Sequence, residues 1–303
     1  MSSQETVKQC CARLYESDFA KVLLGESFHP GGVKLTEHLG TLLGLRAQSR
    51  VLDIASGKGT SALFLAERFG CEVIGVDYSG QNVEQANVAA AAKGVDQRVS
   101  FRTGDAERLP VGDSCFDAII CECAFCTFPD KPAAAHEFSR VLRSGGVIGL
   151  SDLTRGPVLP KELDGLLAWI ACIADAQPLD NYTQYLRGAG FRVAQTESHD
   201  EALLELVNQV RVKLLGAEIM VGLKKLDLPD VDFPGAKEMA QAALTAIQQG
   251  SLGYAIICAT KARNSTSQWY MRHSRCRPFR QICLKTLRIS LLLTLMTIVK
   301  LKN

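Results

Sequence analysis

The chain has 303 residues, 47% of them hydrophobic, with a formal net charge of +2 and eleven cysteines. This length and composition allow a full hydrophobic core, most simply in one large domain with attachments. The sequence does not open with a signal peptide, so we expect a cytoplasmic, reducing location. There, an odd number of scattered cysteines excludes a disulfide framework and indicates free thiols or ligands.

The charge of the chain changes near residue 261. Ten of the 34 basic residues, and none of the 32 acidic ones, fall within residues 261–303. The rest of the chain is therefore net acidic, which argues against a nucleic-acid partner. An apolar run at 289–299 is shorter than the roughly 18 to 20 residues that span a bilayer. We expect residues 262–303 to lie outside the fold, and contact of a basic helix with a membrane surface is the alternative.

Strand patterns and helix patterns alternate along the first half of the chain. Short apolar strands separated by helices are typical of a doubly wound α/β fold with a parallel sheet. In such a sheet, ligands bind at the carboxyl ends of the strands, near the point where strand order reverses. The expected strands are 50–55, 71–76, 99–104, 116–122 and 146–152, and the expected helices are 60–70, 81–94 and 131–146.

The loop after the first strand, DIASGKGT, is the most informative of the chain. Gly57 and Gly59 would let the backbone approach a ligand, and the following helix presents free N–H groups. Asp77 ends the second strand 18 residues after Gly59, where a carboxylate can accept hydrogen bonds from ribose hydroxyls. Either feature alone fits a tight turn or a surface carboxylate, and together they predict a nucleotide-like ligand.

A third motif stands at the end of the third strand. Here Gly104-Asp105-Ala106 is followed by ERLP. Together with VLDIASGKGT, VIGVDYS, FRTGDAERLPVGDSCFDAII and EFSRVLRSGGVIGLSD, this stretch resembles the class I S-adenosylmethionine-dependent methyltransferases over roughly residues 48 to 153. The resemblance implies S-adenosylmethionine as cofactor and a Rossmann-like seven-stranded sheet whose last strand, at 253–261, is antiparallel.

The resemblance also implies roles for individual residues. Gly57 and Gly59 would line the methionine part of the cofactor, Asp77 would hold the ribose, and Asp105 with the Ala106 backbone would face the adenine. Many relatives carry glycine where this chain has Ala55, which we expect to fit with a negative φ. The other residues expected at the cofactor are Tyr15, Asp53, Tyr78 and Cys121.

The family pattern divides the chain into three parts. Residues 1–47 would form an N-terminal helical cap, and residues 48–261 the methyltransferase domain. A helix and the sixth strand are expected within 181–198, followed by a helical insertion at 200–250. Residues 262–303 would be a C-terminal extension.

Three cysteines crowd the end of the fourth strand in CECAFCTF, namely Cys121, Cys123 and Cys126. A structural zinc site needs four ligands, and no second Cys-x-x-Cys unit is present, so we predict no metal site. Cysteine is also among the most buried residue types, which leaves core packing as an alternative. The third alternative is contact with a substrate at the carboxyl edge of the sheet.

Residues 159–191 and the segment CECAFCTFPDK resemble the arsenite methyltransferases, with Cys172 and Cys123 at matching cysteines. Trivalent arsenic prefers thiolates, so Cys172 with Cys123 or Cys126 could hold a soft acceptor, arsenite or a small thiol. The cysteine that this family carries before the first strand is missing from LLGESFHPGG. A quinone-, sterol- or phenol-like acceptor for C- or O-methylation, and a non-catalytic scaffold that binds the cofactor, remain open.

A thiol, phenol or carbon acid must lose a proton before it is methylated, whereas arsenite has a lone pair and needs no base. The candidate bases near the expected cofactor are Glu26, His29 and Glu122. We predict Cys123, Cys126, Cys172 and His29 as the catalytic residues and a small molecule as the acceptor.

Overall fold

The computed structural model describes residues 8–9, 29–163, 173, 175–226, 228 and 231–263. The chain divides into two units, Met1–Arg263 and Asn264–Asn303, and all the described residues belong to the first. Three of the residues singled out from the sequence, Tyr15, Glu26 and Cys172, lie outside the described residues.

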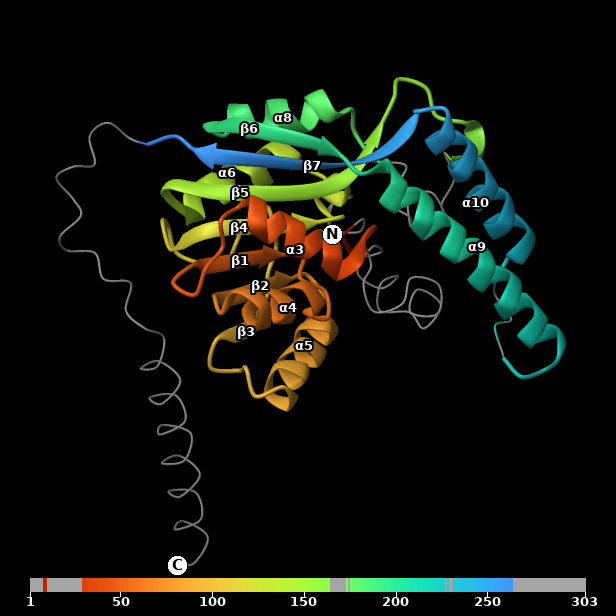
Figure 1. Cartoon of the computed structure of the whole chain (residues 1–303), viewed down its shortest axis with the longest axis horizontal. Helices are drawn as coiled ribbons and strands as arrows, with labels where there is room; N and C mark the ends of the chain where they lie inside the picture. Colours follow the sequence, from red (N-terminus) through yellow and green to blue (C-terminus); the bar gives the residue numbers. More distant parts are fainter. Residues whose placement is uncertain are drawn as a thin grey trace, which may run out of the picture. The chain divides into compact units, whose positions relative to one another are not determined.

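The described residues form a seven-stranded sheet in the order β3-β2-β1-β4-β5-β7-β6 (Figure 1). β7 runs antiparallel to both of its neighbours, β5 and β6, and the other neighbouring pairs are parallel. This arrangement confirms the predicted α/β fold with an antiparallel last strand. The strands are β1 Arg50–Ile54, β2 Glu72–Asp77, β3 Val99–Thr103, β4 Phe116–Glu122, β5 Leu142–Arg155, β6 Phe191–Ser198 and β7 Leu252–Lys261.

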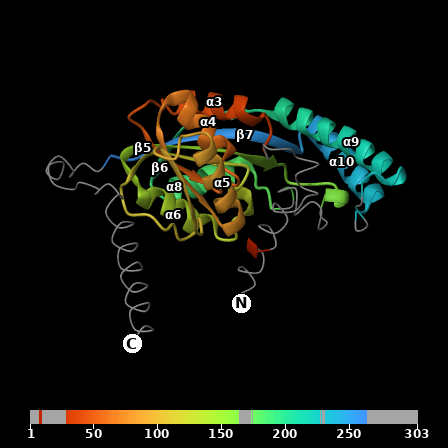
Figure 2. The ribbon, with the colours of Figure 1, turned by 90° about the horizontal axis from the view of Figure 1, so that it is seen from below.

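Helices cover both faces of the sheet (Figure 2). Right-handed crossovers place α4 (Thr60–Phe69) and α5 (Gly80–Ala92) on one face, where α3 (Gly32–Leu42) packs beside α4. On the other face lie α6 (Lys131–Val141) and α8 (Leu179–Gly188). Strand order reverses between β1 and β4, so the crevice for a ligand opens at their carboxyl ends. Two short 3-10 helices follow β4 and β5, at Phe125–Thr127 and Lys161–Leu163.

Side chains and one glycine fix where the helices begin. Ser79 accepts a hydrogen bond from the Asn82 amide at the start of α5, and Asp130 does the same for Ala133 at the start of α6. Gly59 precedes α4 with a φ of 83°, and a Cβ there would lie 2.4 Å from Cζ of Phe101. Only glycine satisfies both the backbone and the packing at this position.

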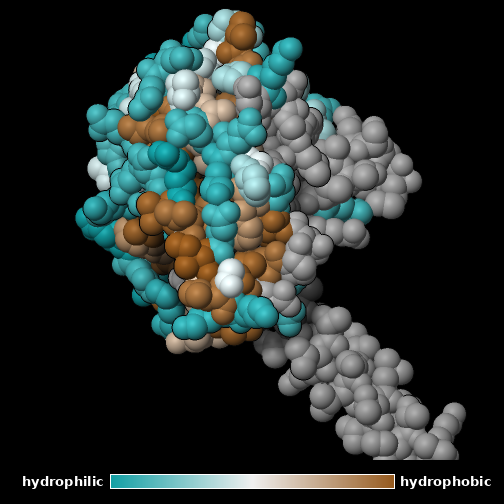
Figure 3. All heavy atoms as spheres, turned by 90° about the vertical axis from the view of Figure 1, so that its right-hand side faces the viewer, coloured by the Kyte–Doolittle hydropathy of each residue, from teal (hydrophilic) through white to brown (hydrophobic). Residues whose placement is uncertain are grey.

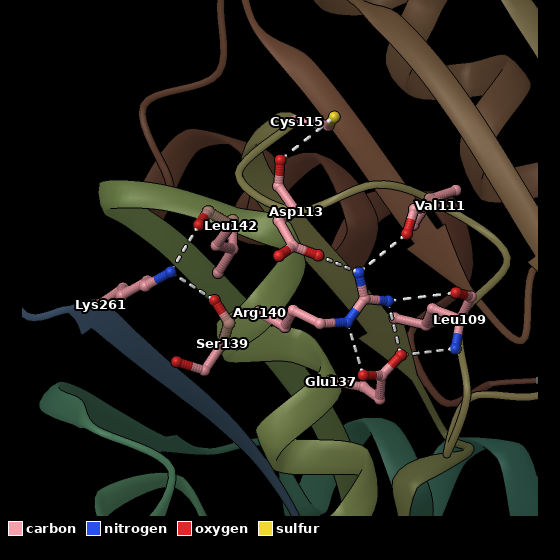
Figure 4. A network of polar contacts seen from close by, with 9 residues as sticks. All are labelled: Leu109, Val111, Asp113, Cys115, Glu137, Ser139, Arg140, Leu142 and Lys261. Atoms are coloured by element: carbon pink, nitrogen blue, oxygen red, sulfur yellow. Dashed lines mark hydrogen bonds and ion pairs between the residues drawn. The ribbon is translucent and has the colours of Figure 1, made fainter. Parts of the chain in front are cut away.

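One predicted helix is too long. The sequence predicts a helix from 131 to the glycines at 145 and 146, whereas α6 ends at Val141 and Leu142 already belongs to β5. Lys261 on β7 donates from Nζ to the carbonyl oxygens of Ser139, at 2.6 Å, and Leu142, at 2.8 Å (Figure 4). The lysine satisfies carbonyls at the helix end that would otherwise lack a partner, and strand pairing replaces the last turn.

Two long helices, α9 (Asp200–Gly222) and α10 (Phe233–Gln248), lie between β6 and β7 and pack against each other. They share a small core of their own, formed by Leu214, Ala217, Phe233, Ala236 and Ala240. Figure 3 shows apolar residues gathered on the side of the molecule from which these helices project. The exposed large apolar residues of α9 are Val212, Leu215, Ile219 and Met220, and Leu223 follows at its C-cap. No helix among the described residues is long and apolar enough to cross a membrane.

Arg140 on α6 fastens the segment that follows the Gly104-Asp105-Ala106 turn (Figure 4). Its guanidinium donates to the carbonyl oxygens of Leu109 and Val111, at 3.1 and 2.9 Å, and to Glu137 Oε1 at 2.6 Å. Glu137 Oε2 in turn accepts the Leu109 amide at 2.7 Å. The hydrogen bond from Arg140 holds the pKa of the Glu137 carboxyl below its ordinary value, against the opposing effect of burial. This network fixes the loop that leads away from Asp105.

Arg140→Ala should lower the free energy of unfolding by about 1–3 kcal/mol, because it removes several charge-assisted hydrogen bonds and leaves Glu137 without its cation. The folded-state pKa of Glu137 is depressed, so its contribution is complete above the unfolded pKa of about 4.3 and is lost as the pH falls through the folded value. Urea unfolding at pH 7 and in acid should show the difference between wild type and variant narrowing in acid.

Arg143→Ala is the matched control, since Arg143 pairs with Asp117 at an exposed position and should contribute less than about 1 kcal/mol. Equal losses of unfolding free energy in the two variants would contradict the role given to Arg140. A difference in unfolding free energy between wild type and Arg140→Ala that stays constant with pH would also contradict it.

Candidate active site

A cavity opens at the carboxyl ends of β1, β2 and β4, where the fold predicts a ligand. Segments far apart in the sequence line it, including Lys8, the loop after β1, the turn after β3 and the residues that follow β4. Most of the residues predicted for the cofactor or for catalysis belong to this lining: His29, Asp53, Ala55, Gly57, Asp77, Tyr78, Asp105, Ala106 and Cys123. Gly59, Cys121 and Cys126 are not among the lining residues.

Asp77 holds the glycine loop in place from the end of β2. Its Oδ2 accepts the Gly57 amide at 2.7 Å, and its Oδ1 accepts the Ser79 amide at 2.9 Å and Asn82 Nδ2 at 3.4 Å. Gly57 has a φ of 53°, and a Cβ built on it would meet no atom within 4 Å. The backbone is thus open toward the cavity, where a ligand can approach it closely.

The expectation that Ala55 has a negative φ is wrong, because its φ is 57°. The loop turns sharply here so that the Ser56 amide can donate to the Val76 carbonyl at 3.1 Å and the Gly59 amide to the Ser56 carbonyl at 2.9 Å. Cys123 after β4 also has a positive φ, 52°, and its amide donates to the Ser151 carbonyl. A left-handed conformation costs a non-glycine residue about 1–2 kcal/mol, and such strain tends to collect at functional sites.

The turn after β3 presents Asp105 to the cavity. Lys8 Nζ donates to Asp105 Oδ2 at 2.7 Å and to Glu107 Oε2 at 2.5 Å, so this residue from the N-terminal region lies over the turn. Burial lowers the pKa of Lys8, but its bonds to the two carboxylates outweigh that effect and leave the pKa raised. Glu107 Oε1 also accepts the Asp130 amide at 2.7 Å, which ties the turn to the start of α6.

Three acidic side chains lie close together in the cavity lining, at or next to the carboxyl ends of β1, β2 and β4. They are Asp53, Asp77 and Glu122. Burial raises the pKa of Asp53 well above its usual range, and the negative charges of Glu122 and Asp77 raise it further. A backbone hydrogen bond from Ala62 acts in the opposite direction. Crowded buried carboxylates of this kind favour a cationic ligand or a proton between them.

Glu122 is the centre of a polar cluster on the cavity wall, and its side chain is only 4% exposed. It accepts the hydroxyl of Ser61 on α4 at 2.6 Å and that of Thr36 on α3 at 3.1 Å. His29 Nε2 lies 3.5 Å from Glu122 Oε2, and His29 Nδ1 lies 3.2 Å from the Pro30 carbonyl oxygen. Nδ1 therefore faces an oxygen that only accepts, and Nε2 faces the Glu122 carboxylate and the hydroxyls of Thr36 and Ser61.

The cysteines of CECAFC take different places. Cys123 lines the cavity, whereas Cys121 and Cys126 are fully buried. Burial raises the pKa of Cys121 well above its usual range, with further contributions from Asp152, Asp53 and Glu122, so this thiol stays protonated. The backbone amide of Cys126 donates to Asp152 Oδ2 at 2.9 Å. Contact of Cys126 or Cys172 with an acceptor stays a prediction.

Comparison with known proteins identifies the family. Residues 51–146 match a family described as a methyltransferase domain. The methyltransferase GfsG of Streptomyces halstedii is 30% identical over 217 residues, which cover 67% of this chain and 78% of the relative. The chain belongs to the class I S-adenosylmethionine-dependent methyltransferases.

Further relatives act on varied acceptors. The 27-O-demethylrifamycin SV methyltransferase of Amycolatopsis mediterranei is 28% identical over 81% of this chain and 93% of its own length. An arsenite methyltransferase of Halobacterium salinarum is 31% identical over 50% of this chain and 39% of its own length. The fold is shared with phosphoethanolamine N-methyltransferase 2 of Haemonchus contortus in complex with S-adenosyl-L-methionine, at a TM-score of 0.71, 19% identity and coverage of 85% and 60%.

The cavity of this methyltransferase fits its cofactor, S-adenosylmethionine. Two buried acceptor atoms of the lining residues, Asp53 Oδ2 and Asn82 Oδ1, have no hydrogen-bond partner within the described part of the chain. The ammonium and hydroxyl groups of the cofactor are donors that would satisfy such atoms. Its positive charge would also offset the electrostatic repulsion among Asp53, Asp77 and Glu122.

Several residues of the site were not predicted from the sequence. Lys8, Asn82 and Ser61 carry no motif, and they line the cavity because the N-terminal region, α5 and α4 pack around it. Thr36 on α3 carries no motif either, and it reaches the site through its hydrogen bond to Glu122. Glu122 was predicted only as one of three candidate bases. Its position at the carboxyl end of β4, beside Cys123, was the signal that could have singled it out.

Asp77→Ala should weaken S-adenosylmethionine binding roughly 10- to 100-fold, because it removes a charged acceptor and frees the Gly57 loop, a loss of about 1.5–3 kcal/mol. Isothermal titration calorimetry measures the affinity, and thermal unfolding checks that the variant is folded. Asp96→Ala, at an exposed position before β3, is the control and should bind normally. Unchanged affinity of the Asp77 variant would remove this carboxylate from the cofactor site.

Proposed function

We propose that this methyltransferase methylates a small protic acceptor, a thiol or a phenol-like hydroxyl, and that His29 removes the acceptor's proton. The observation that carries the proposal is the pairing of His29 with Glu122 on the wall of the cofactor cavity, 3.5 Å apart. A protic acceptor needs such a base, whereas a metalloid with a lone pair does not.

The arrangement of the pair suits proton removal. In the proposal, neutral His29 carries its proton on Nδ1, which lies 3.2 Å from the Pro30 carbonyl oxygen, and Nε2 takes the proton of the acceptor. Glu122 then faces a positively charged ring and stabilises it. The hydroxyls of Ser61 and Thr36 keep the carboxylate in position before and after that step. A carboxylate close to a histidine ring favours its protonated form.

When bound, S-adenosylmethionine supplies an electrophilic methyl group on a sulfonium and leaves as a neutral thioether. In the proposed arrangement, Gly57 lies along its methionine part and Asp77 accepts the ribose hydroxyls. Asp105 and Ala106 face the adenine, while Asp53 faces the ammonium group. The protein then needs only to hold the acceptor in line with the methyl group, and such placement can lower a barrier by about 7–11 kcal/mol.

A soft acceptor such as arsenite is the second candidate, and Cys123 is the observation that favours it. This cysteine lines the cavity in a strained left-handed conformation that a glycine would adopt more readily. Cys123 is the only cysteine of the described residues in the cavity lining, and Cys172, the other expected ligand, lies outside the described residues. The protic acceptor comes first because both members of the His29–Glu122 pair line the cavity.

A turnover screen with labelled donor tests both candidates, with a small thiol, a phenol, a quinone precursor, arsenite and selenite as acceptors. His29→Ala should slow methylation of protic acceptors by about 10²–10⁴-fold while donor binding is retained. The loss should be largest for the least acidic acceptor, which depends most on a base. His136→Ala, which removes an exposed histidine of α6, is the control and should be fully active.

Equal losses for acidic and weakly acidic acceptors, or none, would contradict the role of His29. Turnover of arsenite that survives His29→Ala and is lost in Cys123→Ser would instead favour the soft acceptor. Tight donor binding without turnover of any acceptor would favour a non-catalytic scaffold.

A further inference from the structure

We propose that His38, Glu197 and His199 form a binding site for one divalent transition-metal ion of the zinc, cobalt and nickel class, separate from the methyl-transfer site. Nε2 of His38 lies 2.6 Å from Glu197 Oε2, and Nε2 of His199 lies 3.1 Å from the same oxygen. One ligand-type atom from each residue lies within 4.8 Å of the other two. Two imidazole nitrogens and a carboxylate oxygen thus converge on one point.

The three residues come from separate segments that the fold brings together. His38 stands on α3, Glu197 near the end of β6, and His199 between β6 and α9. The His199 amide donates to the Tyr254 carbonyl of β7 at 2.7 Å, and Glu197 pairs in register with Ile256 of the same strand. The backbones of two of the ligands are therefore fixed by the sheet, and only side chains need to adjust around an ion.

A neighbouring side chain orients the carboxylate. Gln195 Nε2 donates to Glu197 Oε1 at 2.6 Å, which leaves Oε2 directed at the two histidines. Such outer hydrogen bonds are typical of metal ligands, because they fix the direction in which the ligand atom points. The two rings meet edge to face, with centroids 5.7 Å apart, so both nitrogens can face one ion without stacking.

The ligand set selects the kind of ion. Neutral imidazole suits zinc, cobalt, nickel and copper, whereas magnesium and calcium prefer all-oxygen sites. The side chains of His38, Glu197 and His199 are 44%, 24% and 23% exposed, so an ion can enter from solvent and keep water in its remaining positions.

An ion at this site would join α3 to the junction of β6 and α9. Two residues before His38 on the same helix, Thr36 donates to Glu122 in the methyl-transfer site. Gly31, just before α3, lies close to Ala202 of α9, and Leu39 packs beneath Gly149 of β5. Ion binding should therefore stabilise the fold at a place where the active-site wall and the α9 helix meet.

Cobalt binding to the full chain tests the proposal, because the spectrum of Co²⁺ reports its ligands. The chain also has eleven cysteines, and thiolate ligands give an intense near-ultraviolet charge-transfer band that nitrogen and oxygen ligands do not. Wild type should bind one equivalent of Co²⁺ with visible ligand-field bands that lack this feature. His38→Ala, His199→Ala and the isosteric Glu197→Gln should each weaken that binding at least about tenfold.

His136→Ala is the control and should bind Co²⁺ like wild type. Zn²⁺ should displace the cobalt and raise the melting temperature of wild type and His136→Ala, but not of the double variant His38→Ala/His199→Ala. Binding with only a thiolate signature, or a nitrogen-ligand signal that survives the double variant, would overturn the proposal. Such a result would leave the three residues as a hydrogen-bonded cluster.

Discussion

The site depends on the crowding of buried carboxylates at the ends of parallel strands. Asp77 and Glu122 end β2 and β4, Asp53 is the penultimate residue of β1, and the parallel sheet brings all three to one edge. Asp77 accepts hydrogen bonds from backbone amides and Glu122 from hydroxyls, but one oxygen of Asp53 has no partner among the described residues. Burial, and after it the negative charges of Glu122 and Asp77, raise the pKa of Asp53. A cationic ligand beside these carboxylates would offset their repulsion.

Hydrogen bonds fix the backbone around these carboxylates. Methyl transfer requires such a fixed site, because the acceptor must be held in line with the methyl group. Ala55 and Cys123 keep left-handed backbones just after β1 and β4, where the Ser56 amide donates to Val76 of β2 and the Cys123 amide to Ser151 of β5. Arg140 and Glu137 hold the loop that leads away from Asp105, and Lys8 lies over the turn itself. These left-handed residues and hydrogen bonds together fix the shape of the cavity.

The sequence predicted the strands well because each is a short apolar run, and the glycine loop with Asp77 indicated the edge of the sheet where the cavity opens. The local sequence pattern gave wrong predictions where tertiary contacts determine the backbone conformation. Lys261 and the pairing with β7 end α6 earlier than the glycines suggest, and the sharp turn at the cavity gives Ala55 a positive φ. The contacts of Glu122 with Thr36 and Ser61 join residues 86 and 61 positions apart, and no local motif encodes such a meeting.

The central claim is that donor and base share one cavity, with His29 and Glu122 beside the reacting atoms and Asp77 at the ribose. A crystal structure with S-adenosylhomocysteine tests it most directly. The account predicts that the ribose hydroxyls bind Asp77 and that the sulfur faces the His29–Glu122 pair across a space of acceptor size. A sulfur turned away from that pair, or a ribose held elsewhere than at Asp77, would contradict it.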